Sequence, residues 1–167
     1  NITGKNKKRI SDASGTSEAE FSNGMKYFIK TYSDANTPPV FSLCDNTGKQ
    51  IEVLENNFRL NETLAEYNLP RKEFITFKGH EKELNGWIIK PADFDPAKKY
   101  PVYINIYGGP GSNTVSNDWD GFNYMYHQLL AQKGYIVVSV DPRGTMYRGS
   151  DFKKSTYLQL GKLETED

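Results

Sequence analysis

The sequence predicts an α/β fold preceded by an all-β N-terminal part, and three observations predict it. Residues 1–58 hold four short strand-like segments separated by turn signals. Residues 101–140 follow a strand–helix–strand order, which indicates parallel strands joined by a right-handed crossover. Residues 59–70 have helical spacing and separate the two patterns. We therefore expect parts of two domains joined by a short helix.

The N-terminal part is predicted to be a meander of antiparallel strands. Asn23-Gly24 forms a hairpin turn because both residues tolerate positive φ, and Asn36-Thr37-Pro38-Pro39 breaks the chain. The strands lie at 18–22, 25–32, 40–44 and 50–54. Four such strands within about 40 residues are typical of one β-propeller blade. A lone blade cannot bury both faces, so residues 1–58 are interpreted as the last blade of a propeller domain.

The segment 59–70 is predicted to be a linker helix. Its apolar residues at helical spacing are Leu60, Leu64 and Tyr67. Asn61 is a candidate N-cap, and Pro70 lies just past the expected end.

The C-terminal part, residues 71–167, begins with a predicted hairpin of two strands at 74–77 and 84–90. The next strand, 101–107, is almost continuously apolar, as is the strand 135–140. Such composition predicts strands covered on both faces.

A helix is predicted between these two strands, over residues 122–133, and Gly134 ends it. The apolar residues on one side of it are Phe122, Tyr126, Leu129 and Leu130.

Composition excludes several functions. Lys plus Arg equals Asp plus Glu at 21 each, so no net charge attracts nucleic acid, and the basic cluster at 5–9 is interpreted as solvated. No apolar run reaches the roughly 18 residues that a membrane span needs. Cys44, the single cysteine, lies in a predicted strand. We interpret it as a buried, inert thiol rather than a reactive one.

The glycine-rich run at 108–111 does not predict a phosphate or dinucleotide site. The strict G-x-G-x-x-G pattern is absent, and Pro110 lacks a backbone donor. Two distant histidines, His80 and His127, and one cysteine do not form a metal site. No cofactor or metal is therefore expected.

Three motifs in the C-terminal part carry a family resemblance. They are YGGPGS at 107–112, DPRGTMYRG at 141–149 and LGKLETED at 160–167. In this order they resemble the dipeptidyl peptidase IV and prolyl oligopeptidase group of serine peptidases. Residues 21–27 are also similar to a blade repeat of that group, so the resemblance runs from about Gly15 to the last residue.

The resemblance implies a β-propeller followed by the first half of an α/β-hydrolase sheet, truncated before the nucleophile. Family members release N-terminal dipeptides with Pro or Ala at the second position, using a Ser nucleophile, a His base and an Asp. The sequence holds no G-x-S-x-G motif: the nearest approach is residues 15–19, and Ser112 lies on no strand-to-helix elbow. His80 and His127 are interpreted as surface or structural. The fragment itself is therefore expected to be inactive.

Tyr107 is the candidate catalytic residue that the resemblance implies. In the family, the matching tyrosine points its hydroxyl at the developing oxyanion, in the loop between the third strand and the first helix. Gly108, Gly109 and Gly111 are expected to take positive φ and to let the backbone approach the substrate. The alternative is that Tyr107 merely ends a strand and packs.

Further candidates for substrate binding are Arg143, Tyr147 and Trp119. Arg143 has two interpretations, a buried ion pair that organises its loop or a residue that lines the substrate pocket. Asp141 is interpreted as a loop-capping residue, because the family's catalytic Asp comes later in the sequence.

The expected partners are peptide substrates and, through open sheet edges, a second copy of the chain. The resemblance favours a periplasmic, secreted or membrane-anchored location over a cytoplasmic one. The alternative function is a non-catalytic, peptidase-like interaction module. The gene sequence beyond residue 167 distinguishes these two functions.

Overall fold

The computed structural model describes residues 4–5, 7–12 and 14–167, and residues 1–3, 6 and 13 of the predicted segment 1–58 lie outside the described part. The chain divides into two compact units. The first consists of the described residues up to Glu66 together with Asn117–Asp120. The second consists of Tyr67–Ser116 and Gly121–Asp167.

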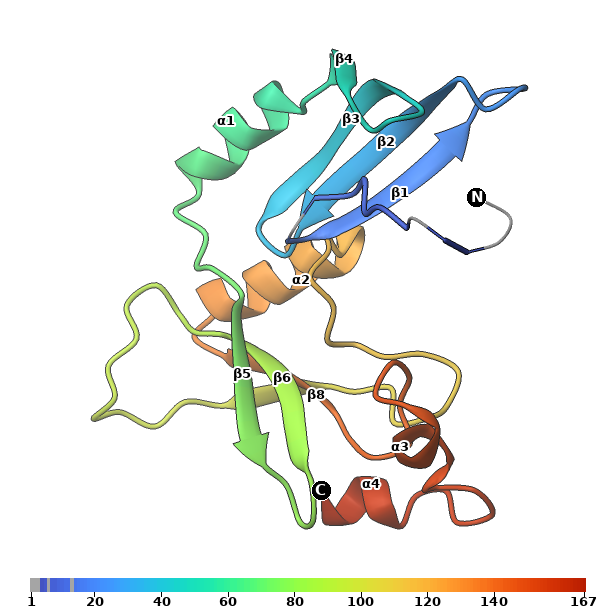
Figure 1. Cartoon of the computed structure of the whole chain (residues 1–167). Helices are drawn as coiled ribbons and strands as arrows, with labels where there is room; N and C mark the ends of the chain where they lie inside the picture. Colours follow the sequence, from blue (N-terminus) through green and yellow to red (C-terminus); the bar gives the residue numbers. More distant parts are fainter. Residues whose placement is uncertain (1–3, 6, 13) are drawn as a thin grey trace. The chain divides into compact units, whose positions relative to one another are not determined.

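The first unit is built on an antiparallel meander with strand order β1-β2-β3-β4 (Figure 1). Its strands are β1 (Thr16–Phe21), β2 (Tyr27–Asp34), β3 (Thr37–Asp45) and β4 (Gln50–Glu55). Each strand pairs with its neighbour in sequence, so four antiparallel strands form where the sequence predicted them.

The turn between β1 and β2 differs from the prediction. Positive φ occurs at Gly24 (81°) and Met25 (54°), not at Asn23. The Met25 N–H donates to the Ser22 carbonyl over 2.9 Å, so Gly24 occupies the third position of a four-residue turn. That position requires positive φ in a type II turn, which is why glycine is favoured there.

The break predicted over 36–39 is confirmed at its start, where residues 35–36 form the turn between β2 and β3, but Pro38 and Pro39 lie inside β3. Asp34 pairs with Thr37 and Tyr32 pairs with Val40, so both prolines lie opposite Ser33 in a β-bulge. A bulge leaves a backbone group unpaired, which suits residues that lack an N–H.

The buried residues of the first unit include Phe28, Ala35 and Cys44. The prediction of a buried Cys44 thiol is confirmed, and burial raises its pKa. Helix α1 (Phe58–Glu66) follows β4 and buries none of its residues. Asn61 is not its N-cap: the Asn61 N–H donates to the Asn57 carbonyl over 3.0 Å, so the helix begins four residues earlier than that cap would require.

The second unit is built on a mixed sheet with strand order β5-β6-β8-β7. Its strands are β5 (Glu73–Lys78), β6 (Glu83–Ile89), β7 (Val102–Asn105) and β8 (Ile136–Asp141). Its helices are α2 (Gly121–Gln132), α3 (Ser150–Lys154) and α4 (Leu163–Glu166). The pairs β5–β6 and β6–β8 are antiparallel, whereas β7 and β8 are parallel and are connected through α2. The parallel pairing predicted for residues 101–140 is therefore confirmed.

The prediction that strand 101–107 is covered on both faces is wrong for this structure. β7 is shorter than predicted and lies at one edge of its sheet, and Ile104 is 60% exposed. Apolar composition does not by itself bury a strand, because its two faces are buried only where other elements pack over the sheet.

The apolar side predicted for α2 is largely exposed, with Phe122 at 85%. Instead the helix buries Tyr124, His127, Gln128 and Ala131. The small Ala131 side chain joins Trp87, Ile89 and Val137 in the core, against which Leu130 also packs. No helix in the described part of the chain is both long and apolar enough to cross a membrane.

Candidate functional site

Tyr107 lies at the start of the loop that leads from β7 to α2, two residues after the strand ends. Its side chain is 53% exposed. A Cβ added to Gly111 would lie 2.8 Å from the Tyr107 hydroxyl oxygen, and one added to Gly109 would lie 3.2 Å from Cε1 of the ring. The tyrosine ring therefore folds over the glycine loop that follows it.

The expectation of positive φ at all three glycines is wrong for two of them. Gly108 has a φ of 68°, whereas Gly109 and Gly111 are not among the residues with positive φ. Their lack of a side chain serves a different purpose, because it leaves room for the Tyr107 ring. The loop thus depends on glycine through one backbone conformation and two close approaches.

Thr114, further along the loop between β7 and α2, connects that loop to the sheet through hydrogen bonds. The Asp141 carboxylate accepts hydrogen bonds from the Thr114 N–H (2.7 Å) and hydroxyl (3.1 Å) and from the Val115 N–H (3.1 Å). The Trp87 indole N–H donates to the Thr114 carbonyl over 2.9 Å, and the Ser139 hydroxyl donates to the Thr114 hydroxyl over 2.7 Å. The interpretation of Asp141 as a loop-capping residue is confirmed, whereas sequence reasoning missed Thr114.

A second loop, residues 141–149, lies against the glycine loop. The Met146 N–H donates to the Ser112 carbonyl over 3.2 Å, and residues 141–145 are all buried. Gly144 has a φ of 100° and would place a Cβ 2.6 Å from the Thr156 hydroxyl oxygen. A buried loop needs internal partners for its polar groups, and this one finds them in the neighbouring loop and in helix α3, where Phe152 accepts from the Gly144 N–H.

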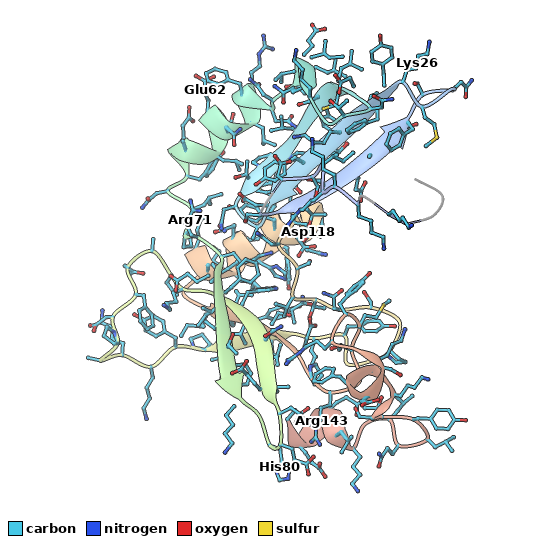
Figure 2. All side chains as sticks on the ribbon, in the orientation of Figure 1. Lys26, Glu62, Arg71, His80, Asp118 and Arg143 are labelled. Atoms are coloured by element: carbon cyan, nitrogen blue, oxygen red, sulfur yellow. The ribbon has the colours of Figure 1, made fainter. Side chains whose placement is uncertain are left out.

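Arg143 lies in that buried loop beside the tip of the β5–β6 hairpin and α4 (Figure 2). Its guanidinium donates to Asp167 through Nε (2.9 and 3.0 Å), to Glu81 through Nη1 (2.9 Å) and to Glu166 through Nη2 (3.3 Å). The Asp167 side chain is fully buried, and its hydrogen bond to Arg143 raises the arginine pKa. The structure thus shows the buried ion pair that was one of the two interpretations of Arg143.

The remaining candidates are divided between the units. Tyr147 belongs to the second unit, is 81% exposed and has a φ of 68°, a conformation uncommon for a residue other than glycine. Trp119 belongs to the first unit, where its backbone N–H donates to the Ser33 hydroxyl over 3.1 Å. The second unit therefore brings Tyr107 and Arg143 onto adjoining loops, and Trp119 is held by the other sheet.

The two histidines fit their predicted roles. His80 is exposed in the turn between β5 and β6, at the tip labelled in Figure 2. His127 is buried in α2 with its ring centroid 5.1 Å from that of Trp87. Among the described residues, no group of three or more His, Cys, Asp or Glu side chains is placed to hold a metal ion.

A cavity of about 560 Å³ lies beside the glycine loop, and sequence reasoning did not predict it. Its lining residues are Pro110, Lys153, Lys154, Thr156, Tyr157, Leu158 and Leu160. The only contribution from the glycine loop is Pro110, and the other residues come from the segment around and after α3.

Comparison with known proteins gives consistent matches. Residues 121–167 match the Prolyl oligopeptidase family. The chain is 36% identical over 160 residues to the probable dipeptidyl-aminopeptidase B of Arthroderma benhamiae, covering 94% of this chain and 17% of that protein. It is 37% identical over 149 residues to the probable dipeptidyl peptidase 4 of Emericella nidulans, covering 88% and 19%.

Solved structures give the same result. The crystal structure of Porphyromonas gingivalis dipeptidyl peptidase 4 matches with a TM-score of 0.87 and 43% identity, covering 95% of this chain and 22% of that chain. A putative dipeptidyl aminopeptidase IV from Bacteroides ovatus matches with a TM-score of 0.78 and 32% identity, covering 92% and 22%. This chain therefore spans about a fifth of the length of the proteins it matches.

The family match places residues 121–167 in the Prolyl oligopeptidase family. Within that class, the chain belongs to the dipeptidyl peptidase IV family, as its three motifs predicted.

Proposed function

We propose that this chain is part of a serine peptidase that releases N-terminal dipeptides with Pro or Ala at the second position. The names of its relatives support a dipeptidyl peptidase. A Ser-His-Asp mechanism and the preference for Pro or Ala follow from the motif resemblance alone. The sequence holds no G-x-S-x-G motif, so we expect none of the three catalytic residues among these 167 residues. The 167 residues alone should therefore be inactive.

The proposed domain organisation keeps the boundaries expected from the sequence: a propeller blade over 1–58, a linker helix over 59–70 and the opening of an α/β-hydrolase domain over 71–167. The meander β1–β4 supports the blade. The crossover from β7 through α2 to β8 supports the hydrolase domain, as does the family match over 121–167.

The contribution of this chain to catalysis is the Tyr107 hydroxyl as an oxyanion-hole donor. The observation that carries this proposal is its position: β7 is the third strand of its sheet in chain order, and Tyr107 opens the loop from that strand to the first helix of the unit. An α/β-hydrolase draws an oxyanion donor from that loop. A phenol O–H binds the developing negative charge more strongly than the neutral carbonyl, so its effect appears in kcat.

The test is Tyr107→Phe in a polypeptide that contains this chain and spans the length of its relatives. We expect kcat on a Gly-Pro chromogenic amide to fall about a hundred- to a thousandfold, with a smaller change in KM. Tyr67→Phe removes the hydroxyl of another exposed tyrosine of the same unit and should leave kcat unchanged. An unchanged kcat in Tyr107→Phe would overturn the proposal.

Association with a second copy is proposed through the exposed edge of β7, because an unpaired edge with apolar side chains favours strand pairing. Sedimentation velocity of the 167-residue chain should show a concentration-dependent dimer. The Ile104→Lys variant should shift it to monomer. A wild-type monomer at about 100 μM, well above the Kd of a specific dimer, would contradict this proposal.

A further inference from the structure

The last residue of β8 and the loop after it hold the glycine loop at two points that flank Arg143 in sequence. Before Arg143, the Asp141 carboxylate accepts from the backbone of Thr114 and Val115. After it, the Met146 N–H donates to the Ser112 carbonyl. The Thr114 end of the segment 112–115 is therefore held by the sheet, and its Ser112 end by the loop that carries Arg143. A shift of that loop is passed to the glycine loop at Ser112.

Arg143 fixes this supporting loop to the rest of the unit. Its backbone N–H donates to Asp167 Oδ2 over 2.8 Å, while its Nε donates to both oxygens of the same carboxylate. Its Nη1 reaches the β5–β6 turn through Glu81, and its Nη2 reaches α4 through Glu166. A planar guanidinium holds such partners in fixed directions, which a lysine ammonium cannot reproduce.

The environment of Arg143 argues against direct binding of substrate. Its side chain is only 5% exposed, and each of its three guanidinium nitrogens already faces a carboxylate of the chain. A ligand carboxylate would have to displace one of these partners. The alternative of a residue that lines the substrate pocket is therefore disfavoured by the geometry.

We propose that Arg143 is a positioning residue that acts on the reaction through Tyr107. This inference rests on the proposed oxyanion role of Tyr107. The network from Arg143 through the second loop to Ser112 helps to set the conformation of the glycine loop, over which the Tyr107 ring folds. A displacement of about 1 Å at a reacting group can lower a rate as much as a hundredfold.

The experiment is a double-mutant cycle of Arg143→Lys and Tyr107→Phe. It uses the polypeptide that contains this chain and spans the length of its relatives. Arg143→Lys alone should lower kcat about 10- to 100-fold with little change in KM. In the Tyr107→Phe background the same substitution should change kcat less than about twofold, because its effect passes through the hydroxyl already removed. Lys90→Ala, which removes the exposed ion pair with Glu73 in the same unit, should change neither constant.

The outcomes separate the two proposals. If Tyr107→Phe lowers kcat but the two effects multiply independently, Arg143 does not act through Tyr107 and this inference fails alone. If Tyr107→Phe has no effect, both proposals fail. Should Arg143→Lys not fold, Glu81→Gln keeps the arginine and its buried partner Asp167, and a several-fold loss of kcat is expected that disappears in the Tyr107→Phe background. An effect of Glu81→Gln that persists there would also overturn the inference.

Discussion

The two units differ in the contacts that hold their central elements. In the first unit every strand pairs with its neighbour along the chain, so many backbone hydrogen bonds stabilise the sheet together. In the second unit, single side chains hold two loops: Asp141 reaches back 27 residues to Thr114, and Arg143 reaches 62 residues to Glu81. In a β-sheet the loss of one hydrogen bond leaves its neighbours in place. A loop held by one carboxylate loses most of its support when that carboxylate is removed.

The strongest test of this contrast is Asp141→Ala. The substitution leaves the Thr114 and Val115 N–H groups without their charged acceptor, so we expect the second unit to lose about 4 kcal/mol of unfolding free energy. Urea unfolding can be followed through buried Trp87 in a Trp119→Phe background, which leaves one tryptophan.

Asp93 supplies the matched control for that experiment, because it is an exposed carboxylate of the same unit. Asp93→Ala should change the unfolding free energy by less than about 0.5 kcal/mol. A loss below about 1 kcal/mol in Asp141→Ala would show that the loop has other sufficient supports.

The second test compares two glycines of the same loop. Gly144→Ala combines a positive φ with a Cβ 2.6 Å from Thr156 Oγ1, so we expect a loss of about 2–3 kcal/mol. Gly149 also has positive φ, but nothing lies within 4 Å of its Cβ position, so Gly149→Ala should cost about 1 kcal/mol. Thermal unfolding measures both, and equal losses would rule out crowding by Thr156.

The third test concerns the β1–β2 turn of the first unit. Gly24 has positive φ and open space around its Cβ position, so Gly24→Ala should cost about 1 kcal/mol. Met25 also has positive φ, and Met25→Gly should therefore stabilise the unit by up to about 1 kcal/mol. Circular dichroism of thermal unfolding checks both signs, and a loss of stability in Met25→Gly would count against this turn conformation.

The smallest effect is expected from the Lys30–Asp12 ion pair, at 3.0 Å. The hydrogen bond that the Asp12 carboxylate accepts from Lys30 lowers the pKa of Asp12 from the ordinary value of 3.8. Stability from the pair is therefore fully present above that value and is lost as the pH falls through the lowered pKa. Because Asp12 is partly exposed, we expect well under about 1 kcal/mol. Asp12→Asn should remove this part of the pH dependence. If the unfolding free energy of the variant falls with acid in the same way as that of the wild type, this prediction is contradicted.

The contrast between the units also explains what the sequence could predict. Strand positions, the parallel crossover and the buried Cys44 depend on local alternation, turn residues and composition, so they were predictable. The resemblance located the glycine loop and the family, but it did not give the contacts. The oxyanion role of Tyr107 remains a prediction.

Several of the errors concern packing or partners that the local pattern does not show. Pro38 and Pro39 fit inside β3 because β2 supplies a bulge opposite them. The buried side of α2 is set by the fit of Ala131 against Trp87 and Val137, not by the number of large apolar residues on a face. The acceptors of Arg143 lie in a hairpin turn and at residues 166–167, and no spacing rule connects them.

The closeness of Gly111 to the Tyr107 hydroxyl has an evolutionary consequence. Any side chain at position 111 would occupy the space of that hydroxyl, so the two positions should not vary independently. In descendants that no longer need the tyrosine, selection against larger residues at position 111 should relax. Among relatives, a tyrosine at position 107 should therefore be accompanied by a glycine at position 111 more often than chance gives, even where the rest of the loop has diverged.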